Sequence, residues 1–293
     1  MRYMVINPYL KKQGLQLELS FIFFILLVLS VIFIAAGGFI MNDIIDRDLD
    51  RVNKPQKTIV NKSIKVRTAN LLYLFFTITG LFLGYYVSYK INYLSFGHIY
   101  LICAGILYFY SINYNKQLFV GNLLISLLVA VVPLIVLVYE IPLQNQNNGA
   151  MIIKNGIDFR LLYIYLLTIS SFAFLLNLIR EIIKDIEDME GDRLINKNTI
   201  PLYTGIQFAK YLVIALILFT IFLLGYFYFK YFKFLLGGIH LLVTIALPLC
   251  LVAYLLYLAS EKRHFTKLSR LIKIIMFNGI LFSFFIFFKY QYA

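Results

Sequence analysis

Two short segments of this chain carry most of its fourteen acidic residues, and their aspartates recur at the same spacing. The first reads NDIIDRDLD over residues 42–50, and the second reads KDIEDMEGD over residues 184–192. On a helix, offsets of zero, three and seven residues fall within roughly 60° of one another, so each trio is predicted to form one carboxylate face. The two trios are Asp43, Asp46 and Asp50, and Asp185, Asp188 and Asp192.

Carboxylates that converge without a counter-ion repel one another, so most of them stay ionised only near bound cations. Magnesium prefers hard oxygen ligands, and proteins commonly hold it with a few carboxylates plus the phosphates of a substrate. The repeated segments therefore predict a site for Mg²⁺ and a diphosphate. The six aspartates are its candidate catalytic and metal-binding residues.

The composition indicates where these segments lie. Hydrophobic residues make up 61% of the chain, which excludes an ordinary soluble domain and predicts an all-α integral membrane protein. Eight apolar stretches are long enough to span a bilayer as helices. They cover residues 20–41, 67–88, 95–113, 119–139, 161–183, 210–229, 235–258 and 271–289.

A net charge of +13 would suggest nucleic acid as the partner of a soluble protein, but here the charge follows the sides of the membrane. Most Lys and Arg residues lie in the segments 42–67, 114–118, 180–210 and 259–273. The positive-inside rule places these segments, and both aspartate motifs, on the cytoplasmic face of the plasma membrane. No nucleic-acid partner is expected.

The connections between the predicted spans differ in what they suggest. Residues 140–160, with the run QNQNNG, are expected to form a flexible external loop. The segments 51–66 and 193–209 follow the two aspartate motifs and are expected to cap the site. The duplicated motif also suggests one domain, 1–293, made of two pseudo-repeated four-helix halves, about 1–140 and 160–293, around a central cavity.

These motifs resemble those of the UbiA superfamily of intramembrane prenyltransferases. NDIIDRDLDRVNKP (42–55) is similar to that superfamily's N-D-x-x-D-x-x-x-D signature. REIIKDIEDMEGDR (180–193), followed by TIP (199–201), is similar to its D-x-x-x-D region. Among the branches of the superfamily, the residues of the second motif most resemble those of the branch that prenylates geranylgeranylglyceryl phosphate.

The resemblance implies that Mg²⁺ bridges the aspartates and an allylic diphosphate, so that the diphosphate leaves and an allylic carbocation is attacked by the acceptor. Asn42 joins the first metal-binding half by this resemblance. The implied substrates are a polyprenyl diphosphate, in this branch geranylgeranyl diphosphate, and a lipid-soluble or amphiphilic acceptor, both reached from the surrounding membrane lipid. The best-supported acceptor is geranylgeranylglyceryl phosphate, and an aromatic quinone precursor is the alternative.

Basic and polar residues near the motifs are candidates for binding the substrate. For each basic residue beside the motifs, contact with diphosphate oxygens and anchoring at the membrane surface are equally favoured. The stretch YSINYNK approximates a further family element, Y-x-x-x-K, with altered spacing. Asn177 either lines the cavity or packs against a helix. The candidates are Asn42, Arg51, Tyr110, Lys116, Asn177, Arg180, Lys184 and Arg193.

Two departures from the family pattern stand out. The first motif continues as NKPQKT, with Lys57 in place of an arginine that offers a bidentate fork. The family fold is also expected to have nine helices. The segment MRYMVINPYLKK therefore looks like the end of a first helix that is missing from this sequence.

A divalent-cation transporter is the rival of another class, since acids near a membrane also mark ion pathways. Transport acids usually lie in mid-span, in helices interrupted by Gly or Pro. The acids of this chain lie at helix ends and are followed by basic segments suited to phosphate. Their placement favours the enzyme.

Overall fold

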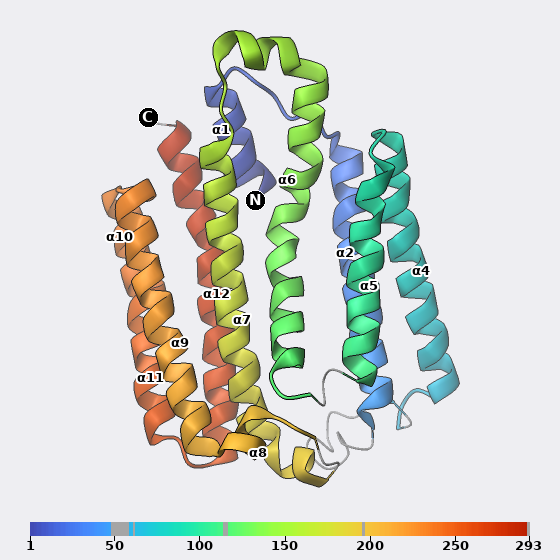
Figure 1. Ribbon diagram of the computed structural model, residues 1–293, viewed down its shortest axis with the longest axis vertical. Coiled ribbons are helices and arrows are strands. Elements are labelled where there is room, and N and C mark those ends of the chain that lie inside the picture. The colour runs from blue at the N-terminus through green and yellow to red at the C-terminus, as the bar shows by residue number, and fades with distance from the viewer. Residues whose placement is uncertain (48–58, 61, 114–116, 195–196, 292–293) are drawn as a thin grey trace. The chain divides into compact units, whose positions relative to one another are not determined.

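The computed structural model describes residues 1–47, 59–60, 62–113, 117–194 and 197–291, and this part of the chain is almost wholly helical (Figure 1). Eight helical segments of the described chain are long and apolar enough to cross a membrane, as predicted. They are α2 (Phe21–Ile45), α4 (Val66–Lys90), η2 with α5 (Leu94–Phe96 and Gly97–Ile112), α6 (Val120–Asn155), α7 (Arg160–Leu194), α9 with η4 (Ile206–Phe227 and Tyr228–Phe232), α10 with η5 and α11 (Leu235–Leu241, Leu242–Ala246 and Leu247–Leu258), and α12 (Lys262–Gln291). Shorter helices are η1 (Arg2–Ile6), α1 (Asn7–Lys12) and α8 (Ile200–Thr204).

The chain divides into two compact units. The first contains Met1–Glu18, Ser126–Glu187 and Thr204–Ala293, and the second contains Leu19–Ile125 and Asp188–Tyr203. The long helix α7 thus contributes its body to the first unit and its last turns to the second. The pseudo-repeats inferred from the motifs stay a prediction.

In the second unit, α2, α4 and α5 pack against one another (Figure 1). The Ser30 hydroxyl on α2 donates a hydrogen bond of 2.7 Å to the carbonyl of Gly80 on α4. A Cβ at Gly80 would lie 3.0 Å from both the Ile34 nitrogen and the Ser30 carbonyl oxygen, so only glycine lets the two backbones approach this closely. This packing fixes α2, whose final turn carries the start of the first aspartate motif.

In the first unit, α11 packs against α9 and α12, and α12 also contacts η1 and α1. Two lysines hold helix ends in this unit. Lys210 donates to the carbonyls of Tyr257 and Ala259 at the end of α11. Lys289 donates to the carbonyls of Tyr231 and Phe232, at 3.1 and 3.2 Å. Both ammonium groups satisfy carbonyls that a helix terminus leaves without an internal partner.

The prediction of a flexible loop over residues 140–160 is wrong, because α6 continues as a helix to Asn155. Glu140, Gln144 and Asn148 lie along one face of this extension and bond in series, from Gln144 Nε2 to Glu140 at 2.9 Å and from Asn148 Nδ2 to Gln144 at 3.1 Å. Glu18 completes the face, since its N–H donates to Glu140 at 2.6 Å and its carboxylate accepts from Asn148. The polar run is therefore helical because its side chains are satisfied by the segment before α2.

Candidate active site

The first aspartate motif spans the end of α2. Asn42 and Asp43 lie in its last turn, where Asn42 is half-buried and Asp43 is exposed. Asp46 is the C-cap, with φ −85° and ψ 6°, and its N–H donates to the Asn42 carbonyl at 2.8 Å. The expected single helical face is thus interrupted at Asp46, because aspartate favours turns and its charge opposes the negative C-terminal end of the helix dipole. Asp50 lies outside the described residues.

The second motif lies wholly on α7. The predicted span ended at residue 183, but the helix runs on to Leu194. The Lys, Glu, Met and Leu residues of this extension favour a helix, whereas its three aspartates and Gly191 do not. Arg193 in the last turn suits the C-terminal dipole. Asp185, Asp188 and Asp192 therefore share one helical face, as the spacing predicted. Asp185 belongs to the first compact unit, whereas Asp188 and Asp192 belong to the second.

The second unit brings part of both motifs together. Asp192, from α7, interacts electrostatically with Asp188 and with Asp46 at the end of α2. The Asp192 side chain is only 1% exposed, and neither carboxylate oxygen has a hydrogen-bond partner in the described structure. The Lys197 ammonium is 3.6 Å from Asp192 Oδ1. A buried carboxylate with unfilled acceptor positions beside other carboxylates is an environment suited to a cation.

These oxygen donors fit Mg²⁺, which takes carboxylates and leaves coordination positions for water or phosphate. Among the described residues, no three Asp, Glu, His or Cys side chains already converge closely enough to hold a metal ion. Asp46, Asp188 and Asp192 are the residues of the second unit that would contribute to such a site. Asn42 and Asp43 lie one turn before Asp46 on α2, and Asp185 lies one turn before Asp188 on α7.

Two of the predicted phosphate ligands on α7 are paired with an acid that the sequence reading missed. Glu181 is buried, with 7% of its surface exposed, and it forms an ion pair with Arg180. The Lys184 ammonium lies 3.9 Å from the other Glu181 oxygen. The sequence did contain a signal for this pairing, because residues three apart on a helix, such as Glu181 and Lys184, are neighbours on its surface. Arg193 is exposed at the end of the helix, and Arg51 and Lys116 lie outside the described residues.

The two remaining candidates have different environments. Asn177 is buried on α7, and its amide donates to the Ser126 hydroxyl on α6 at 3.2 Å. This contact favours the helix-packing alternative over a cavity-lining role. Tyr110 is half-buried near the end of α5 in the second unit. Lys197 is the second residue that the sequence reading missed, although it is the one basic residue between Arg193 and the TIP sequence.

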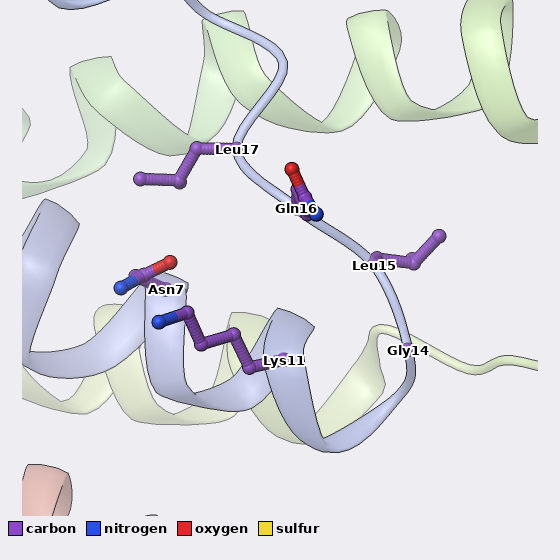
Figure 2. Close-up of a pocket in the computed structure, with 6 residues that line it drawn as sticks. All are labelled: Asn7, Lys11, Gly14, Leu15, Gln16 and Leu17. Atoms are coloured by element: carbon purple, nitrogen blue, oxygen red, sulfur yellow. The ribbon is translucent and has the colours of Figure 1, made fainter.

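A pocket of about 540 Å³ lies on the N-terminal segment of the first unit (Figure 2). In Figure 2 the amino end of Lys11 reaches toward Asn7, one turn earlier on α1, and the chain from Gly14 to Leu17 forms the opposite wall. Tyr9 on α1 donates to the Asp158 carbonyl just before α7, at 2.5 Å. Asp185 lies some 25 residues further along α7, roughly 38 Å away at 1.5 Å per residue. The pocket is therefore distant from Asp185, the motif aspartate of the same unit.

Comparison with known proteins identifies the class. The profile of the UbiA prenyltransferase family matches residues 14–279, and the chain belongs to that family. It is a multi-pass membrane prenyltransferase, as the motifs predicted. The assignment to this family also excludes the cation transporter considered from the sequence.

Individual relatives agree with this assignment. The chain is 30% identical over 257 residues to digeranylgeranylglyceryl phosphate synthase of Methanosphaera stadtmanae, a match that covers 86% of this chain and 82% of the relative. A solved structure described as digeranylgeranylglyceryl phosphate synthase in membranes is 25% identical, with a TM-score of 0.62 and coverage of 98% of this chain and 92% of that one. A UbiA homolog from Archaeoglobus fulgidus bound to DMAPP and Mg²⁺ shares the fold, at 18% identity and a TM-score of 0.57, with 96% of this chain and 95% of that one covered.

Proposed function

We propose that this prenyltransferase transfers a geranylgeranyl group from its diphosphate to geranylgeranylglyceryl phosphate, in a reaction that requires Mg²⁺. The names of the relatives support the acceptor, and the Mg²⁺ bound to the Archaeoglobus homolog supports the metal. The observation that carries the proposal is the buried Asp192 carboxylate, which interacts with Asp188 and Asp46 and has acceptor positions to spare.

In this proposal Asp46, Asp188 and Asp192 supply the oxygen ligands of the metal site in the second unit. Asn42, Asp43 and Asp50 of the first motif, and Asp185 of the second, are the further candidates. Bound there, Mg²⁺ would stabilise the negative charge that develops on the departing diphosphate. The packing of α2 against α4 and α5 fixes the helix end that carries Asp46.

Basic residues complete the proposed diphosphate site. Arg193 is exposed beside Asp192, so its guanidinium is available to bind phosphate oxygens in a bidentate way. Lys184 and Arg180 are held by Glu181, which positions them along α7. Arg51 and Lys116 remain candidates from the motifs alone, and Tyr110 is a candidate for orienting the substrate.

We place the site at the cytoplasmic face of the plasma membrane. The segments 42–67, 114–118, 180–210 and 259–273 include both aspartate motifs and hold most of the chain's Lys and Arg residues. The positive-inside rule assigns such segments to the cytoplasm. Prenyl diphosphates are water-soluble at one end and apolar at the other, so a site at the membrane surface suits them. The segments 51–66 and 193–209 are proposed to cap it.

The test is diphosphate release by the purified protein in lipid vesicles supplied with geranylgeranyl diphosphate. Geranylgeranylglyceryl phosphate, an aromatic acid and no acceptor are compared, each with Mg²⁺ and with a chelator. Release that needs both Mg²⁺ and the glyceryl phosphate supports the proposal. Release with the aromatic acceptor alone would replace the proposed acceptor, and release that persists in the chelator would remove the metal from the mechanism.

A further inference from the structure

Lys197 is attached to the candidate site through the backbone as well as through its side chain. Its N–H donates a hydrogen bond of 3.0 Å to the Asp192 carbonyl, which is the six-to-one bond that commonly closes a helix C-terminus. Its ammonium lies 3.6 Å from Asp192 Oδ1, and the side chain is 13% exposed. The chain just after α7 thus holds Lys197 next to Asp192, the most buried carboxylate of the site.

The ion pair between Lys197 and Asp192 is loose. Charge-assisted N–H···O bonds usually measure about 2.7–2.9 Å, and the separation here is well beyond that range. Both Asp192 oxygens also lack a hydrogen-bond partner in the described structure. Lys197 therefore offsets the charge of Asp192 without filling its acceptor positions.

A counter-ion is needed at this place even before a metal binds. Asp192 is buried and interacts with the charges of Asp188 and Asp46, and an ionised carboxylate in such surroundings is costly unless it is paired. Lysine suits a temporary pairing, because its ammonium is a compact charge on a flexible four-carbon stem. Rotation of that stem moves the charge while the backbone bond to Asp192 keeps the residue in place.

We propose that Lys197 is a displaceable counter-ion, which neutralises Asp192 in the metal-free enzyme, gives way to Mg²⁺ and then binds the diphosphate. This inference rests on the proposed function, since it requires Asp192 to be a metal ligand. Lys197 would thus have two successive partners, first the Asp192 carboxylate and then the diphosphate. Lys197 weakens binding of the bare metal, because it competes for Asp192, and it strengthens binding of the metal together with diphosphate.

The opposed effects define the experiment. Lys197→Met removes the charge with little change in size, Lys197→Gln is a second neutral variant, and Lys197→Arg keeps the charge. Lys154→Met, at the exposed end of α6, is the matched control. Affinity for Mn²⁺ alone is measured by paramagnetic resonance on the full chain in lipid nanodiscs, and affinity for inorganic pyrophosphate is measured by calorimetry at saturating Mg²⁺.

We expect the neutral variants to bind Mn²⁺ about fivefold more tightly and pyrophosphate about tenfold more weakly. Each change in affinity corresponds to the gain or loss of about one charge–charge contact. Lys197→Arg should keep both affinities near those of the wild type, and Lys154→Met should change neither. Loss of both affinities in the neutral variants, or no change in either, would assign Lys197 a structural role and overturn the inference. A wild-type chain that binds no Mn²⁺ would overturn the proposed metal site as well.

Discussion

Asp192 and Glu190 stand two residues apart on α7, yet the first is almost fully buried and the second is exposed. Their charges therefore have different consequences. Water screens the carboxylate of Glu190, whereas the charge of Asp192 acts on Asp188 and Asp46 through a medium of lower dielectric constant. A matched pair of amide substitutions separates the two roles.

Asp192→Asn should lower prenyl transfer by about 10²-fold or more, because it removes a charged ligand from the site where charge develops. Its melting temperature should change little, since the neutral amide removes a buried charge next to two others but also leaves Lys197 without its counter-ion. Glu190→Gln should leave both values near those of the wild type. Turnover assays and calorimetric melting check this, and normal turnover by Asp192→Asn would remove Asp192 from the site.

Glu181 illustrates a different effect of burial. Glu181→Gln leaves Arg180 partly buried without its counter-charge, so we expect a loss of about 3 kcal/mol in the free energy of unfolding. Glu261→Gln breaks the exposed pair with Arg263 and should cost under about 1 kcal/mol. Chemical denaturation in detergent compares the two variants. Equal losses would show that the pairing of Glu181 adds no more than a surface contact.

At the scale of elements, α2 and α4 depend on a glycine at their crossing. Gly80→Ala places a Cβ 3.0 Å from backbone atoms of α2, and overpacking of this kind costs about 1–3 kcal/mol. Gly105→Ala on α5 meets no atom within 4 Å, so its higher helix propensity should stabilise the chain by up to about 1 kcal/mol. Thermal melting measures both variants. A destabilised Gly105→Ala, or an unaffected Gly80→Ala, would contradict the packing described.

The helix boundaries show what a sequence can and cannot reveal about an element. Hydropathy located the spans, because bilayer thickness sets a minimum apolar length that α2 and α4 satisfy on their own. It did not extend α6 over residues 140–155, since the partners of that polar face lie at residues 16–18, far away in sequence. Hydropathy also ended α7 at residue 183, because its charged last turns are too polar for an apolar window, and only the spacing of the aspartates predicted a helix there.

The candidate site was predictable to a similar degree. The repeated spacing identified the aspartates, because a helix converts sequence offsets into one face. The proximity of Asp46 to Asp192 follows from the packing of the second unit, which the spacing alone does not specify. The roles of Glu181 and Lys197 depend on distances of a few ångströms, and a lysine near an acidic motif is as well explained by anchoring at the membrane.

Ligand binding should be visible at the scale of the whole molecule. A ligand that binds only the folded state at a hundred times its dissociation constant stabilises that state by about 2.7 kcal/mol. We therefore expect Mg²⁺ with pyrophosphate to raise the melting temperature and a chelator to reverse the shift. The chain has no Trp, so calorimetry is the suitable measurement. An unchanged melting temperature at concentrations that support turnover would contradict a shared metal and diphosphate site.

The polar face of α6 has a consequence for the order in which the protein is made. Glu140 is separated by 122 residues from Glu18, whose N–H donates to its carboxylate. A ribosome produces the chain from the N-terminus, so residues 16–18 leave it long before α6 does. The donor is thus synthesised before the buried acid that needs it. Biogenesis of this helix is therefore sensitive to the fate of a short segment that is synthesised well before it.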